Sequence, residues 1–119
     1  MERLRHRKDF VTAKSGAKVQ VSAFELQVRK RRGGGPTRVG FTVTKRLGNA
    51  VERNRVRRRL REVVRLSKAG MRPGHDYVLL GRPAALVEPF DRMREEFERA
   101  LRRVHADRKN APRGDATAS

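Results

Sequence analysis

The stretch from Val43 to Ser67 constrains the fold most, because it combines one aliphatic stripe with arginines at most of the positions between. From Val51 onward, apolar or small side chains recur at the i, i+4, i+7 and i+8 spacing that indicates one buried helical face. The residues of this stripe are Val56, Leu60, Val63, Val64 and Ser67. Upstream, Gly48-Asn49 breaks the preceding strand, and Asn49 is suited to cap the helix. We therefore predict a helix that packs its aliphatic side on a core.

The polar side of this predicted helix is strongly and asymmetrically charged. At about 100° per residue, Asn54, Arg58, Arg61 and Arg65 fall opposite the stripe. Arg55 and Arg59 flank one edge of the stripe, and Arg53 and Arg57 flank the other. A merely solvated face would carry acids spaced to pair with these bases, but only Glu52 and Glu62 are present. The repulsion that remains favours contact with a polyanion.

The composition of the whole chain agrees with this interpretation. The 119 residues fit one domain with a modest core. They include 31 basic and 13 acidic residues, which give a formal charge of +18. Such a field attracts phosphate backbones with a steep dependence on salt. Arginine outnumbers lysine, which favours bidentate phosphate contacts and stacking on unpaired bases.

Several other classes of protein are disfavoured. The absence of cysteine excludes disulfides, thiolate catalysis and zinc knuckles. No apolar run approaches the ~18 residues of a membrane span, and no signal peptide is recognisable, so we expect a cytosolic protein. His6, His75 and His105 lie in separate segments without ligand spacing, and His75-Asp76 should point to opposite faces of a strand. The sequence therefore predicts no catalytic centre and no metal site in the polypeptide itself.

The remaining elements follow from periodicity and turn signals. Alternating side chains predict strands over 19–29 and 38–44, with an apolar and therefore interior strand over 77–80. A glycine-rich, hairpin-type connection is expected over 30–36. Amphipathic patterns predict helices over 2–14 and from residue 88 or 89 to about 105, and residues 106–119 are expected to be a disordered tail. The polar faces of the first two strands predict an open groove for a single strand of nucleic acid.

One segment carries a specific family resemblance. Residues 41–62 read FTVTKRLGNAVERNRVRRRLRE, which resembles the signature of the bacterial ribonuclease P protein component, with its RNR triplet at Arg53-Asn54-Arg55. The flanks agree in register: Asp9-Phe10 and Gly16 precede the signature, and His75-Asp76-Tyr77 and Arg82 follow it. The resemblance spans roughly residues 3 to 105, so we expect a single RNA-binding domain over 1–105.

The resemblance implies an α+β fold. That fold is a two-layer α/β sandwich with a mixed four-stranded sheet, three helices and a left-handed βαβ crossover around the arginine helix, as in the second domain of a small-subunit ribosomal protein. Handedness rules alone favour a right-handed crossover, so this feature is an expectation from the family only.

The resemblance also implies a division of labour. A large catalytic RNA, with Mg²⁺ bound mainly by that RNA, removes the 5′ leader from precursor tRNA, and the protein alone is inactive. The implied partners are the catalytic RNA and the leader, with no membrane and no obligate protein partner. The residues that match the RNR region are implied to bind the catalytic RNA: Lys45, Arg46, Arg53, Asn54, Arg55, Arg57, Arg58, Arg61 and Arg65.

A second set of residues is implied to line the leader groove: Phe10, Gln27, Arg38 and Thr42. On general grounds a lone aromatic such as Phe10 is more often core than ligand, and only the resemblance favours a leader contact. Family members often carry an aromatic at the position of Gln27, so stacking in this groove should be weaker here. Two alternatives remain: an RNA-binding protein of ribosomal or chaperone type without enzymatic context, and an autonomous nuclease.

Overall fold

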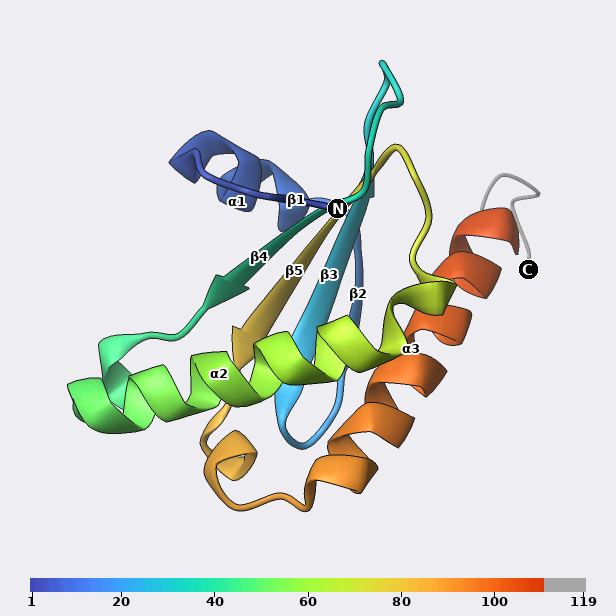
Figure 1. Cartoon of the computed structure of the whole chain (residues 1–119). Coiled ribbons are helices and arrows are strands. Elements are labelled where there is room, and N and C mark those ends of the chain that lie inside the picture. Colours follow the sequence, from blue (N-terminus) through green and yellow to red (C-terminus); the bar gives the residue numbers. More distant parts are fainter. Residues whose placement is uncertain (111–119) are drawn as a thin grey trace.

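The computed structural model describes residues 1–110 of the chain (Figure 1). Five strands, three α-helices and three short 3-10 helices alternate along it. In chain order they are β1 (Glu2–Arg3), α1 (Arg7–Ala13), β2 (Ala17–Gln20), β3 (Phe24–Lys30), β4 (Arg38–Thr42), η1 (Lys45–Leu47), α2 (Ala50–Ser67), η2 (Lys68–Gly70), β5 (His75–Gly81), η3 (Pro83–Leu86) and α3 (Phe90–Asn110).

The strands form one mixed sheet in the order β1-β4-β5-β3-β2. The prediction of an interior strand over 77–80 is confirmed, because β5 pairs in parallel with β4 on one side and antiparallel with β3 on the other. The predicted hairpin over 30–36 is wrong, since β5 lies between the two strands that this loop connects. A hairpin requires direct pairing, and nothing local in the sequence shows that a later strand will insert.

The sheet has five strands instead of the predicted four. The extra strand is β1, whose two residues pair in parallel with Arg38 and Val39. The stretch predicted as one strand over 19–29 is divided: β2 and β3 form a true hairpin around a turn in which the Val21 N–H donates to the Phe24 carbonyl at 2.9 Å. These differences leave the predicted α+β class intact.

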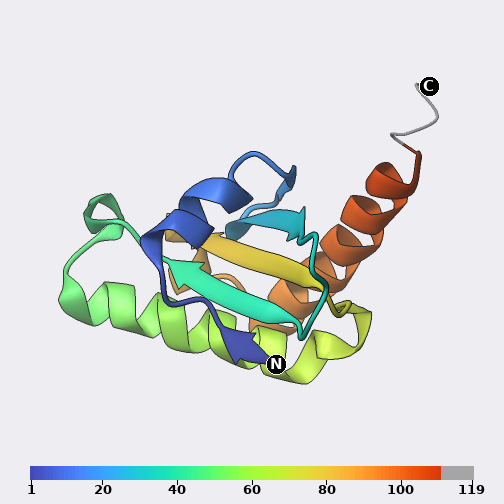
Figure 2. The ribbon, with the colours of Figure 1, turned by 90° about the horizontal axis from the view of Figure 1, so that it is seen from above.

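Helices α2 and α3 cover one face of the sheet, and α1 crosses the other (Figure 2). Viewed with α2 in front of the sheet, β4 lies to the left of β5 and both strands run downward (Figure 1). The β4–α2–β5 connection is therefore left-handed, as the family resemblance implied. The main core lies between the sheet and the α2–α3 layer, where Phe24, Leu26 and Leu79 meet Leu60 and Phe97.

Helix α2 forms as its sequence predicts. Asn49 accepts a hydrogen bond from the Glu52 N–H at 2.9 Å, and the Glu52 carboxylate accepts one from the Asn49 N–H at 3.0 Å, which completes a capping box. A Cβ at position 48 would lie 2.2 Å from the Glu52 carboxylate, so this box requires glycine there. All five residues of the predicted stripe are buried, and Val51 stays outside.

The two outer helices differ from their predicted limits. The segment predicted as helix over 2–14 begins as β1, and α1 starts only at Arg7. At the other end α3 continues to Asn110, so residues 106–110 of the predicted tail are helical. The rest of the predicted tail, residues 111–119, lies outside the described residues. Among residues 1–110, no helix combines the length and the apolar character that crossing a bilayer requires.

Candidate nucleic-acid interface

The outer side of α2 carries a shallow cationic surface, which we call the arginine face: Asn54, Arg57, Arg58 and Arg61. These side chains, with Val51, line a hollow of about 400 Å³. Val51 is 75% exposed, so an apolar patch lies beside the guanidinium groups. Capping and the aliphatic stripe fix the rotation of α2, and this rotation points the arginine face away from the core. The arrangement suits a ligand that offers both phosphates and flat bases.

The other predicted α2 residues have different surroundings. Arg55 is exposed, and Lys45 and Arg46 are exposed on η1, immediately before α2. Arg53 donates to the Gly48 carbonyl at 2.7 Å and so helps to hold the start of the helix. Arg65 pairs with Glu62 one turn earlier and is the one α2 arginine in a carboxylate pair within the described residues. Acid pairing therefore does not neutralise this surface.

Arg59 differs from its neighbours because it points inward. Its guanidinium donates to the Ala85 carbonyl at 2.7 Å and to the Glu88 carbonyl at 2.5 Å, and so joins α2 to the segment that precedes α3. Burial, followed by the nearby charge of Arg55, lowers the pKa of Arg59, while Glu88 acts in the opposite direction. Arg59 thus has a structural role that the exposed arginines of α2 lack.

The second predicted surface is the sheet face opposite α2 and α3. The strand registers align Gln27, Val78 and Gly40 in one row across β3, β5 and β4, and Glu25, Leu80 and Thr42 in the next. Phe10 reaches this face from α1 and packs beside Leu4, Ala13 and Val78. A Cβ at position 40 would lie 2.5 Å from the Phe10 ring, so glycine at this position lets the ring approach the sheet.

The predicted leader residues are unequally accessible. Phe10 and Thr42 are half-buried and border the face, whereas Gln27 is only 5% exposed and donates to the Glu25 carboxylate at 2.8 Å. The sequence predicted an open groove on this face, and in the structure α1 lies across part of the face. Phe10 is only partly packed: one part of its ring contacts the residues around it, and the rest faces solvent.

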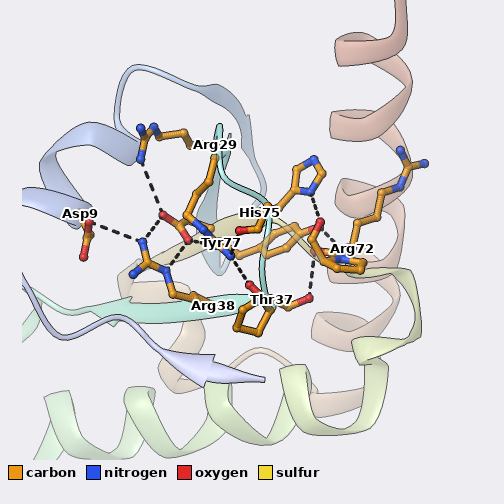
Figure 3. Close-up of polar contacts among 12 residues, drawn as sticks. Asp9, Arg29, Thr37, Arg38, Arg72, His75 and Tyr77 are labelled. Atoms are coloured by element: carbon orange, nitrogen blue, oxygen red, sulfur yellow. Dashed lines mark hydrogen bonds and ion pairs between the residues drawn. The ribbon is translucent and has the colours of Figure 1, made fainter.

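Arg38 belongs to an ion cluster around Asp76, which is fully buried (Figure 3). Arg38 donates from Nε to Asp76 Oδ1 and from Nη2 to Oδ2, both at 2.8 Å. Arg31 Nη1 donates to Asp76 Oδ1 at 2.5 Å, and Arg29 Nη1 lies 3.9 Å from Asp76 Oδ2. Asp9 of α1 lies 3.5 Å from Arg38. Although Arg38 lies at the groove, carboxylates already engage its guanidinium.

The Asp76 carboxylate keeps its charge in this cluster. Burial by itself would raise the pKa of Asp76, but hydrogen bonds from Arg38 and Arg31 outweigh burial, and the pKa lies below its ordinary value. The same contacts raise the pKa of Arg38. The role of Asp76 as the anchor of three arginines depends on strand pairing, which no local signal in the sequence reveals.

His75 and Asp76 lie on opposite faces of β5, as predicted, so they do not form an acid–base pair. His75 faces the helix layer near Tyr77, whose hydroxyl lies 2.8 Å from His105 Nε2 and accepts from the Arg72 N–H at 2.8 Å. These contacts join α3 to β5. Within residues 1–110, no three His, Asp or Glu side chains gather as metal ligands.

Comparisons with known proteins agree with this geometry. A family model described as Ribonuclease P matches residues 1–105. The ribonuclease P protein component of Ruegeria pomeroyi is 48% identical over 107 residues, covering 87% of this chain and 86% of that protein, and the one from Brucella suis is 44% identical, covering 83% and 77%. Among solved structures, the RNase P protein from Thermotoga maritima is 32% identical with a TM-score of 0.74, covering 87% of this chain and 98% of that one.

Proposed function

This chain belongs to the ribonuclease P protein family, and from that membership we propose how its surfaces divide the work of the enzyme. The chain is the protein subunit of ribonuclease P, which acts in tRNA processing. In our proposal a catalytic RNA subunit cuts the 5′ leader from precursor tRNA in the cytoplasm, and the protein alone is inactive. The observation that carries this proposal is the arginine face, which presents guanidinium groups outward around a shallow hollow on α2.

The arginine face binds the catalytic RNA in this proposal. Arg58 and Arg61 of this face and the neighbouring Arg55 are exposed, and no described carboxylate forms an ion pair with them. RNA phosphates would relieve their mutual repulsion and release counterions from the RNA. Lys45 and Arg46 extend the same charge past the start of α2. Arg53 and Arg65 contribute less, because the Gly48 carbonyl and Glu62 already accept from them.

The sheet face under α1 receives the leader. Phe10 offers an aromatic edge for an unpaired base, and Thr42 offers a hydroxyl at the end of β4. Gln27 is a buried part of this face and donates a hydrogen bond to Glu25. Arg38 adds positive potential to the face while its guanidinium is hydrogen-bonded to Asp76. Mg²⁺ is assigned to the catalytic RNA, because the described residues do not provide a fitting ligand set.

Reconstitution tests the proposal. The protein is added to a ribonuclease P RNA at low Mg²⁺ concentration, and precursor tRNA cleavage is measured. We expect the protein to stimulate cleavage by the RNA and to cut nothing alone. RNA binding without stimulation would favour an RNA chaperone, and cleavage by the protein alone would favour an autonomous nuclease.

Replacing Phe10 with alanine should weaken binding of precursor tRNA to the holoenzyme and leave leaderless tRNA unaffected. Loss of one stacked base costs about 1–3 kcal/mol, or roughly tenfold to hundredfold in Kd. Val11→Ala is the matched control, because Val11 is the exposed neighbour of Phe10 on the same helix. Equal weakening for both tRNAs would remove Phe10 from the leader site. Thermal melting of both variants separates lost packing from lost contact.

A further inference from the structure

The edge of the sheet between β1 and α2 contains a small hollow, which we call the edge hollow. Strand β1 pairs with β4 only as far as Val39, so from Gly40 onward β4 runs on as the outer strand of the described sheet. At this point a space of about 220 Å³ opens, with Leu4, Phe10 and Phe41 among its walls. Figure 2 shows β1 at this edge of the sheet, beside β4 and over α2. The edge hollow thus lies between the sheet face under α1, which is proposed to receive the leader, and the arginine face.

Four arginines from separate parts of the chain converge on the edge hollow. Arg3 shares the register of Val39 and therefore lies on the side of the sheet that faces α2, whose Arg57 and Arg61 line the same space. Arg5 lines it from the segment that follows β1. The nearest acid in sequence, Glu2, shares the register of Arg38 and so lies on the opposite side of β1. Among residues 1–110, no acidic side chain lines the edge hollow.

The positive charges gathered at this hollow repel one another, and a bound anion would relieve that repulsion. Burial, followed by the charges of Arg3 and Arg57, lowers the pKa of Arg61, which means that its neighbours oppose its positive charge. Elsewhere the fold neutralises gathered arginines with a carboxylate, as Asp76 does for Arg31 and Arg38. Guanidinium groups around an apolar floor match a phosphodiester flanked by a sugar and a base.

We propose that the edge hollow binds a backbone phosphate of the precursor tRNA leader, with Arg3 and Arg5 as phosphate ligands beside Arg57 and Arg61. This inference rests on the proposed function and extends the leader path from Phe10 to the arginine face. The leader is the favoured strand because Phe10, its proposed contact on the sheet face, also forms a wall of the hollow. The short strand β1 then has a function, since its pairing with β4 fixes the position of Arg3.

The test uses the reconstituted holoenzyme with an Arg3→Ala/Arg5→Ala double variant. Binding of precursor tRNA should weaken about tenfold at low salt, and the slope of log K against log salt should fall by about one unit. Binding of leaderless tRNA should not change. Leaders with one neutral methylphosphonate at successive positions then locate the contact. At the position that occupies the hollow, the neutral group should abolish the difference between the variant and the wild type.

Two further variants keep the result interpretable. Arg99→Ala/Arg103→Ala removes the same charge from exposed positions on α3 and should leave leader-dependent binding unchanged. Arg3→Lys/Arg5→Lys keeps the charge and should restore most of the affinity. Wild-type affinity in the alanine variant would overturn the proposal, as would equal weakening for leaderless tRNA or for the catalytic RNA alone. A wild-type protein that fails to stimulate cleavage would instead overturn the proposed function.

Discussion

Replacing Asp76 with asparagine is expected to lower the free energy of unfolding by about 3–5 kcal/mol, because removal of one partner leaves half-buried cations uncompensated. Arg38 and Arg31 would lose their shared carboxylate, and the Asp76 side chain is fully buried. The cluster joins β3, β4 and β5 and reaches α1 through Asp9. Denaturant unfolding measures the change. Glu62→Gln, which disrupts only an exposed pair on α2, should produce a far smaller change.

The same substitution predicts a specific dependence on pH. Because the pKa of Asp76 is lower in the folded protein than in the unfolded chain, its contribution is fully present above the unfolded pKa of about 4. It is lost as the pH falls through the folded pKa. The stability difference between wild type and Asp76→Asn should therefore be constant near neutral pH and shrink in acid. A difference that grew in acid would contradict this account of the cluster.

The arginine helix shows how far local pattern alone determines structure. The spacing of Val56, Leu60 and Val63 fixed the rotation of α2, and the Gly48-Asn49 pair fixed its start. Arg57 and Arg59, which were predicted to flank opposite edges of the aliphatic stripe, do lie on different sides of α2. Arg57 points toward the sheet edge, and Arg59 points toward η3. These features depend on contacts within a few residues or on a single buried face, so periodicity is sufficient to find them.

What the sequence did not show depends on pairing between distant segments. A two-residue strand such as β1 has no periodicity, and only its contact with β4 defines it. The insertion of β5 between β3 and β4 is likewise a property of the topology, and the left-handed crossover was expected from the family resemblance alone. The edge hollow and the Asp76 cluster both depend on this topology. Arg3, Arg5 and Arg31 therefore appeared in the sequence only as members of a generally basic composition.

Loss of the outward arginines should weaken assembly with the catalytic RNA, while loss of the inward one should not. An Arg55→Ala/Arg58→Ala variant removes two exposed guanidinium groups, and we expect the salt slope of RNA binding to fall by about two units. Affinity at low salt should fall roughly tenfold per group, from about 1.5 kcal/mol for each charge-assisted contact.

Arg59→Ala is the matched contrast on the same helix. It leaves the Ala85 and Glu88 carbonyls without their donor, so it should lower stability by about 1 kcal/mol. The salt slope should stay at the wild-type value, because Arg59 points into the protein and not toward a phosphate. If Arg59→Ala reduced the slope by as much per charge as Arg55→Ala/Arg58→Ala, net charge alone would govern binding. The orientation of α2 would then have no part in RNA recognition, and the division between its inward and outward arginines would be refuted.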